Sequence, residues 1–160
     1  MRSKIENLEK LIKEDKYQVL LMSCPIFFFA RHPWFVLNEK GKISRYEIMH
    51  FKSDKTNNYL HINEFLPFIS FITYTSRKFN IPDKPILLKC IEGDEGSLAH
   101  KAIEFIKNSG KNYPFLDKYS LVAGPNSNTY AQWVLNKFPE FNIKLSWRFI
   151  GKNYKIEVGL

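Results

Sequence analysis

The residues best suited to chemistry lie in a short polar turn at residues 124–129, Gly-Pro-Asn-Ser-Asn-Thr. The turn separates a predicted extended segment at 119–123 from a predicted helix at 130–138. A serine at the start of a helix lies beside unpaired backbone N–H groups and the positive end of the helix dipole, which stabilise an alkoxide or a developing oxyanion. Ser127 is therefore a candidate nucleophile. Because Asn and Ser are also common cap residues, Ser127 or Asn128 could cap this helix without any chemistry, and spacing alone favours that structural role.

A serine is a weak nucleophile unless a base such as an imidazole lies within hydrogen-bond reach. Of the four histidines, His100 falls in a predicted helix among charged neighbours, and His61 falls in a segment of ambiguous structure. His32 is expected to open a strand, and a hairpin return would bring Glu47 alongside it to orient the ring. Glu47 and His50 would face opposite sides of a regular strand, so only one of them can contact His32, and we favour Glu47. An edge-strand role for His32 without chemistry is an equal alternative.

Several patterns predict the elements that would position these side chains. Apolar residues recur at helical intervals in 5–16 and in 94–110, and β-branched and aromatic runs predict strands at 17–22, 27–37, 43–51 and 86–91. The turn 38–42 would join two strands as a hairpin, with Gly41 at positive φ. We favour a helix for the ambiguous residues 57–80, and we expect 143–150 and 155–158 to be extended. Without repeats or linkers, the pattern indicates one α+β domain over residues 1–160, with a small antiparallel sheet packed on helices.

The composition excludes several classes of protein. A chain of 160 residues can bury one hydrophobic core, and its 44% hydrophobic and 16% aromatic residues exclude a disordered protein. No apolar run reaches the roughly 20 residues that a membrane span needs. The first sixteen residues are charged throughout, unlike a secretory signal, so we expect a cytoplasmic protein.

Neither a cofactor nor a metal is expected. The two cysteines and four histidines are dispersed, so they give no disulfide framework and no metal-ligand spacing, and the chain has no glycine-rich phosphate loop. The net charge of +8 fits a polyanionic partner, but the lysines are scattered along the chain, which makes nucleic-acid binding the less favoured prediction. The expected partner is an unidentified small molecule or peptide.

The polar turn and its surroundings resemble a bacterial family of unknown function whose members carry a Gly-Pro-Asn-Ser-Asn-Thr-aromatic signature. The resemblance rests on residues 113–119, on the turn 124–129 followed by Tyr130 and Trp133, and on Ile-Gly-Lys-Asn-Tyr at 150–154. The segments His-Pro-Trp at 32–34 and Tyr-Glu-Ile at 46–48 also look like that family's His-x-Trp hairpin. The match is specific over 113–154 and looser before it, and it does not cover residues 1–30 or 57–81.

More distantly, the arrangement is similar to circularly permuted papain-like proteins, among them the lecithin retinol acyltransferase-like group and the PPPDE-type peptidases. In those proteins a strand histidine precedes an Asn-Cys-x-x-Phe motif at a helix start. The resemblance implies His32 as the base and Ser127 at the nucleophile position, with Asn126 before it and Tyr130 at the aromatic position. Serine stands where those enzymes have cysteine, and an alkoxide is harder to generate beside an imidazole than a thiolate.

Three hypotheses follow for the function. The first is a hydrolase or acyltransferase of the permuted papain-like class, in which Ser127, His32 and Glu47 face one cleft and act on an amide or ester bond. The residues expected to contact the ligand are Asn126, Asn128, Trp34 and Tyr130. The second hypothesis is the same fold as a catalytically inactive binding domain, and the third is a basic nucleic-acid-binding module. The sequence supports the first two almost equally, so whether the protein is an enzyme stays open.

Overall fold

The computed structural model describes residues 2–26, 29–71 and 85–155, with side chains from residue 6 onward. Its elements follow in the order α1 (Arg2–Glu9), β1 (Tyr17–Ile26), β2 (Ala30–Glu39), β3 (Lys42–Ile48), β4 (Leu60–Ile62), β5 (Ile86–Gly93), α3 (Leu98–Lys107), α4 (Ser109–Asn112), α5 (Ser127–Lys137) and a 3₁₀ turn, η1 (Pro139–Phe141). They form an α+β domain, as the sequence pattern predicted.

The five strands form an antiparallel sheet in the order β4-β3-β2-β1-β5, with β2 in the middle. The predicted hairpin joins β2 to β3, with Glu39 opposite Lys42. Its two turn residues, Lys40 and Gly41, take φ of 51° and 92°. Positive φ at both positions matches the twist of the flanking strands. The prediction for Gly41 is therefore confirmed.

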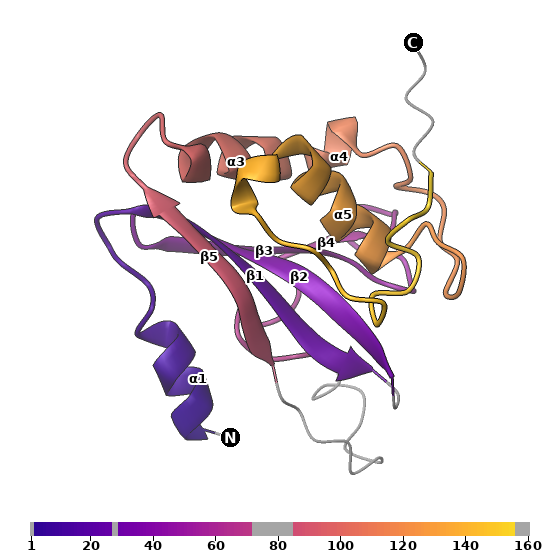
Figure 1. Cartoon of the computed structure of the whole chain (residues 1–160), viewed down its shortest axis with the longest axis horizontal. Coiled ribbons are helices and arrows are strands. Elements are labelled where there is room, and N and C mark those ends of the chain that lie inside the picture. The colour runs from indigo at the N-terminus through magenta and orange to yellow at the C-terminus, as the bar shows by residue number, and fades with distance from the viewer. Residues whose placement is uncertain (1, 27–28, 72–84, 156–160) are drawn as a thin grey trace.

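Each face of the sheet carries its own apolar cluster. Alternation along β2 sends Phe35 and Leu37 toward α3 and α5, and Trp34 and Val36 to the opposite face. Figure 1 shows α3 and α5 lying over one face, and α1 on the other side of the sheet. The larger cluster lies under α3 and α5, while the smaller one is closed in part by Phe68. The sheet therefore separates a helix-covered face from a face covered partly by loop.

Several element boundaries differ from the predictions. The first helix ends at Glu9, and α3 starts at Leu98 with Ser97 as its N-cap, so helix does not occupy all of 5–16 or 94–110. The third strand stops at Ile48 rather than reaching residue 51. Residues 119–123 and 143–150 form turns and coil without strand pairing. Residues 27–28 and most of 155–158 lie outside the described residues.

The ambiguous segment 57–80 is not helical in its described part. Residues 57–71 contain the short strand β4, and a loop follows it. Side chains of β2 and β3 donate hydrogen bonds to backbone carbonyls of this loop. Trp34 Nε1 donates to Pro67 O at 2.8 Å, and Arg45 Nη1 donates to Leu66 O and Ile69 O. Tertiary contacts thus satisfy carbonyls that a helix would have paired internally. Residues 72–80 lie outside the described residues.

Among the helices in the described part of the chain, none is long and apolar enough to cross a membrane.

Candidate active site

The structure brings Ser127, His32 and Glu47 into one hydrogen-bonded chain, although Ser127 and His32 lie 95 positions apart in the sequence. Ser127 Oγ lies 3.1 Å from His32 Nδ1, and His32 Nε2 lies 2.8 Å from Glu47 Oε2. The side chains come from the N-terminus of α5, the start of β2 and the end of β3. A carboxylate only accepts, so Nε2 carries the ring proton in neutral His32 and Nδ1 is free to accept from the Ser127 hydroxyl.

All three side chains are removed from bulk water. The exposed fractions are 4% for Ser127, 4% for His32 and 1% for Glu47. Electrostatic interactions are stronger in such a low-dielectric site than at the surface. The ring of Phe71 contacts His32 edge-on at a centroid distance of 5.0 Å. The imidazole is therefore held by an aromatic neighbour as well as by its two hydrogen-bond partners.

Asn126, rather than Ser127 or Asn128, caps helix α5. Its Oδ1 accepts from the N–H groups of Asn128 and Thr129 at 3.0 and 3.3 Å, and Thr129 Oγ1 accepts from the Asn126 N–H at 3.1 Å. This reciprocal pair is a capping box. Ser127 thereby becomes the first helical residue, and no described residue accepts a hydrogen bond from its backbone N–H. One amide at the positive end of the helix is left beside the Ser127 hydroxyl.

A late segment of the chain holds this turn in place. Ile150 O accepts from Asn126 Nδ2 at 3.1 Å and from Asn128 Nδ2 at 2.7 Å, and Gly151 O accepts from Thr129 Oγ1 at 2.7 Å. Gly151 has a φ of 87°, and a Cβ on it would lie 2.5 Å from Asn126 Nδ2. The turn and residues 150–151 are thus packed too closely for any side chain at position 151.

Arg45 is a residue of this site that the sequence analysis missed. Its guanidinium contacts the Glu47 carboxylate twice, with Nε 2.7 Å from Oε1 and Nη2 2.9 Å from Oε2. The remaining nitrogen, Nη1, donates to Leu66 O and Ile69 O, and the guanidinium carbon Cζ lies 4.5 Å from the centroid of the Trp34 ring. Residues two apart on a strand share a face, which is the signal that could have linked Arg45 to Glu47.

The charge of Glu47 is controlled by these neighbours. Burial acts to raise the pKa of this carboxyl, but the Arg45 guanidinium and His32 outweigh burial and hold the pKa below its usual range. Glu47 is therefore ionised at neutral pH despite being almost fully buried. An ionised carboxylate fixes the tautomer of His32 and stabilises the ring when it takes up a second proton.

The four residues expected to contact a ligand all have partners within the fold. Asn126 caps α5, and Trp34 lies against Arg45 and donates to Pro67 O. Tyr130 is buried in the core with its hydroxyl 2.7 Å from Ser109 Oγ, and burial raises its pKa. Asn128 differs from the others, because its buried Oδ1 accepts no hydrogen bond from any described residue. An unpaired buried acceptor beside Ser127 is the most suitable of the four for a ligand.

The other histidines lie outside this hydrogen-bonded chain. His61 Nδ1 lies 2.6 Å from Glu64 Oε2 and its Nε2 lies 2.9 Å from Phe51 O. His50 is more exposed, and partial desolvation of its ring, together with the nearby His32 and His61, lowers its pKa. His100 accepts from the Gly96 N–H on the surface of α3. Among the described residues, no group of three or more His, Cys, Asp or Glu side chains is placed to hold a metal ion.

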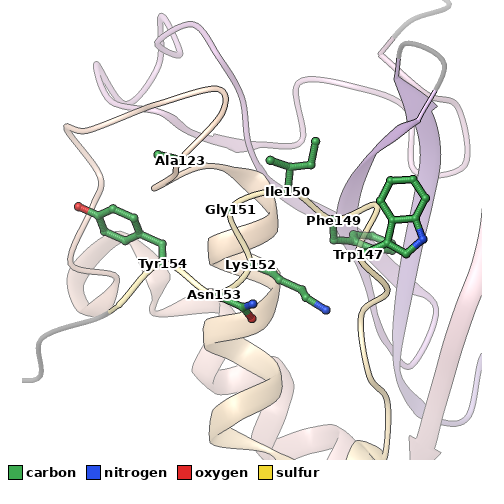
Figure 2. A pocket seen from close by; sticks show the side chains of 8 residues that line it. All are labelled: Ala123, Trp147, Phe149, Ile150, Gly151, Lys152, Asn153 and Tyr154. Carbon is green, nitrogen blue, oxygen red and sulfur yellow. The ribbon is translucent and has the colours of Figure 1, made fainter.

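A cavity of about 540 Å³ lies next to the segment that holds the turn. Figure 2 shows Trp147, Lys152 and Tyr154 among the residues that line it. Ile150 and Gly151 also line it, and their carbonyls contact the capping residues of α5. Trp147 is 72% exposed. Ser127 itself does not line this cavity.

The chain was compared with protein families, curated proteins and solved structures. No curated protein and no solved structure matches it. One family model, described as a protein of unknown function (DUF3750), matches residues 17–154, a range that includes His32, Glu47 and Ser127. Because this match covers most of its length, the chain belongs to the DUF3750 family.

Proposed function

We propose that Ser127, His32 and Glu47 form a catalytic triad that transfers the acyl group of an amide or ester. The observation that carries this proposal is the unbroken hydrogen-bonded chain from the Ser127 hydroxyl through both nitrogens of His32 to Glu47, at 3.1 and 2.8 Å. Nucleophile, base and orienting carboxylate are the three parts that serine-based acyl transfer requires.

In the proposed reaction, Ser127 Oγ attacks the carbonyl carbon of the substrate while His32 Nδ1 takes the hydroxyl proton. The tetrahedral intermediate collapses as the bond to the leaving amine or alcohol breaks, and His32 returns the proton to that leaving group. Water or another acceptor then attacks the acyl-serine ester and loses its proton to His32. The bond from the acyl carbon to Ser127 Oγ breaks, and His32 returns the proton to Ser127 Oγ. These reaction steps require no oxidant, metal or cofactor.

Two features of the site support this sequence of steps. Glu47, paired with Arg45, is an ionised partner for the imidazolium that forms during proton transfer. The Ser127 N–H lies at the positive end of α5 and donates to no described residue, so it is suited to the negative oxygen of the tetrahedral intermediate. Removing one such donor typically costs about 10²–10³-fold in rate in serine enzymes.

The order of the parts along the chain supports a permuted papain-like arrangement. The histidine is on a strand of the first half of the chain, and the nucleophile follows at the first residue of a helix packed on the sheet. Phe35 of β2 contacts Tyr130 of α5 edge-on at 5.9 Å, so the helix rests directly on the strand that carries His32. Serine stands where the papain-like enzymes have cysteine, so the nucleophile depends on an adjacent base to remove its proton.

A catalytically inactive binding domain of the same fold is the second candidate. The low exposure of Ser127 favours it, because only 4% of the residue reaches solvent. The hydrogen bonds of Asn126 and Asn128 to Ile150 O also give the turn a structural purpose. In this case the hydrogen bonds that link the side chains of Ser127, His32 and Glu47 would serve only to satisfy buried polar groups.

Labelling by a fluorophosphonate separates the two candidates. We expect the folded protein to be labelled at Ser127, and the Ser127→Ala and His32→Ala variants to lose the label. Ser146→Ala is the matched control, because Ser146 is exposed and lies outside the site. A small ester, p-nitrophenyl acetate, tests the same site with a less bulky reagent. Absence of labelling and of ester turnover in the correctly folded protein would favour the inactive binding domain.

A further inference from the structure

A second groove, separate from the triad, combines positive charge with an apolar wall. It encloses about 360 Å³ at the start of β2 and β5, alongside the coil at 143–149. Its cationic side chains are Arg31, Lys144 and Arg148, and its wall includes Leu88, Leu145 and Phe149. None of the described residues that line it is acidic. The volume falls within the range of small-molecule sites.

Arg31 is fixed at the edge of this groove without a carboxylate. Its Nε donates to Ser23 Oγ at 2.7 Å and its Nη2 to Ser23 O at 3.4 Å, so its contacts in the described part of the chain are with neutral oxygens. The backbone N–H of Arg31 donates to Arg148 O at 3.0 Å, which holds the two backbones side by side, and Arg148 Nε donates to Phe29 O at 3.1 Å. Burial and the charge of Arg148 lower the pKa of Arg31. A bound anion would stabilise the charged form of Arg31 against both its burial and the charge of Arg148.

The apolar wall distinguishes this groove from a general polyanion-binding surface. Leu145 and Phe149 are almost fully buried, and Ile86 at the rim is 42% exposed. A nucleic acid would need a track of positive charge that extends over several nucleotides, whereas this groove encloses only about 360 Å³. A compact groove with cations on one side and aliphatic and aromatic carbon on the other suits a ligand that is itself divided into an anionic and an apolar part.

We propose that this groove binds an amphipathic anion, a carboxylate or phosphate that carries an alkyl chain. The anionic group lies between the guanidinium groups of Arg31 and Arg148 and the Lys144 ammonium, and the chain lies along Leu88 and Leu145. Arginine suits this task because its planar fork binds carboxylate and phosphate oxygens in pairs. The site does not depend on the reactivity of Ser127, since Arg31 precedes His32 on β2 and faces the opposite side of the strand.

Isothermal titration calorimetry with octanoate and octyl phosphate tests this site, and the comparison of the two shows which head group is preferred. We expect at least one of them to bind, and acetate, inorganic phosphate, octanol and octyltrimethylammonium to bind far more weakly. We expect Arg148→Gln to weaken binding about tenfold or more, because hydrogen bonds to charged groups are the strong ones.

Lys144→Gln provides a second variant, because Lys144 is exposed and its replacement leaves the core intact. It should weaken binding, whereas Lys137→Gln, an equally exposed lysine at the far end of α5, should not. Labelling of Ser127 by the fluorophosphonate is scored separately, so failure of one proposal does not imply failure of the other. The groove proposal is overturned if neither anion binds, if octanol or octyltrimethylammonium binds as tightly, or if Lys144→Gln and Lys137→Gln behave alike.

Discussion

Two clusters of one serine, one histidine and one glutamate occur in this fold, and they are connected in different orders. In the first, the imidazole of His32 lies in the middle, between Ser127 and Glu47. In the second, the carboxylate of Glu64 lies in the middle, with His61 on one oxygen and Ser53 on the other. The far nitrogen of His61 faces the carbonyl of Phe51 instead of a hydroxyl.

The order of connection decides what each cluster can do. Both nitrogens of His61 face acceptor oxygens, so that ring offers no lone pair to a hydroxyl. Ser53 Oγ also accepts from the N–H groups of Lys55 and Thr56, which fixes a turn. Among the histidines and their described partners, only His32 has one nitrogen on a carboxylate and the other on a hydroxyl, which is the arrangement that general-base catalysis needs. The same residue types thus give the connectivity of the proposed catalytic triad in one place and a different connectivity in the other.

The largest expected effect is the difference in turnover between the variants that lack Ser127 and Ser53. Ser127→Ala should lower turnover of a small ester by about 10⁴-fold or more, because loss of the nucleophile disables the whole triad. Ser53→Ala should leave turnover per folded molecule unchanged and lower only the free energy of unfolding. Ester hydrolysis and urea unfolding measure the two quantities. Equal losses of turnover in both variants would remove the distinction between the clusters.

The two carboxylates provide the next comparison. Glu47→Gln should reduce turnover by about 10²–10⁴-fold and destabilise the fold by about 3–5 kcal/mol, because Arg45 would be left buried without a counter-charge. Glu64→Gln should cost less, since its side chain is partly exposed at 17%. Chemical unfolding checks the stabilities. A Glu47→Gln variant as stable as the wild type would show that the Arg45 pair contributes little.

Acid should lower the free energy of unfolding in part by protonating Glu47. The Arg45 guanidinium and His32 outweigh burial and lower the pKa of Glu47 from its ordinary 4.5, so the unfolded state takes up this proton before the folded state does. Its stabilising contribution is therefore complete above about pH 4.5 and is lost as the pH falls through the lower folded-state pKa.

Urea unfolding as a function of pH measures whether the free energy of unfolding falls with pH as this account of Glu47 predicts. The wild type and Glu64→Gln should lose stability as the pH falls below about 4.5, and Glu47→Gln should lose less over the same interval. A parallel decline in all three proteins would mean that other groups dominate acid unfolding.

The smallest effect is expected at Tyr130. Ser109 Oγ donates to Ile106 O at 2.6 Å, so the Tyr130 hydroxyl is the donor to Ser109 Oγ. Tyr130→Phe should lower the free energy of unfolding by about 0.5–1.5 kcal/mol and leave turnover unchanged, because the ring itself remains in place. Thermal unfolding together with ester hydrolysis checks both parts. A loss of turnover would restore Tyr130 as a ligand-contacting residue.

The sequence was informative where side chains follow from strand periodicity and turn chemistry. The hairpin at residues 38–42 rests on local turn chemistry, and Glu47 lies on β3 as the alternation argument required, whereas His50 lies beyond the end of that strand at Ile48. Arg45 could have been inferred by the same argument, because it shares a face with Glu47. Its importance was hidden because three of its partners are carbonyls and rings contributed by distant residues.

Other features could not be derived from local patterns. The helix predicted within residues 57–80 does not form in the described part of that segment, because Phe68 packs in the second core and side chains of β2 and β3 donate hydrogen bonds to the loop carbonyls. The cap of α5 was assigned to Ser127 or Asn128 rather than to Asn126. That choice is fixed by residues 150–151, whose carbonyls hold Asn126 and Asn128. Contacts between distant segments decided each of these cases.

The most direct test of the proposed triad is the acidity of a thiol placed at the nucleophile position. In Ser127→Cys, ultraviolet absorbance of the thiolate reports its pKa without requiring any reagent to enter the site, and the wild-type spectrum accounts for Cys24 and Cys90. Burial raises the pKa of Cys90, so that thiol ionises later.

A thiol next to a base that can accept its proton should titrate at or below about 7.5, compared with about 8.5 for a free thiol, and Ser127→Cys/His32→Ala should return it to about 8.5 or higher. A thiol at or above the free value in Ser127→Cys, or a low value that persists without His32, would contradict the assignment of His32 as the base.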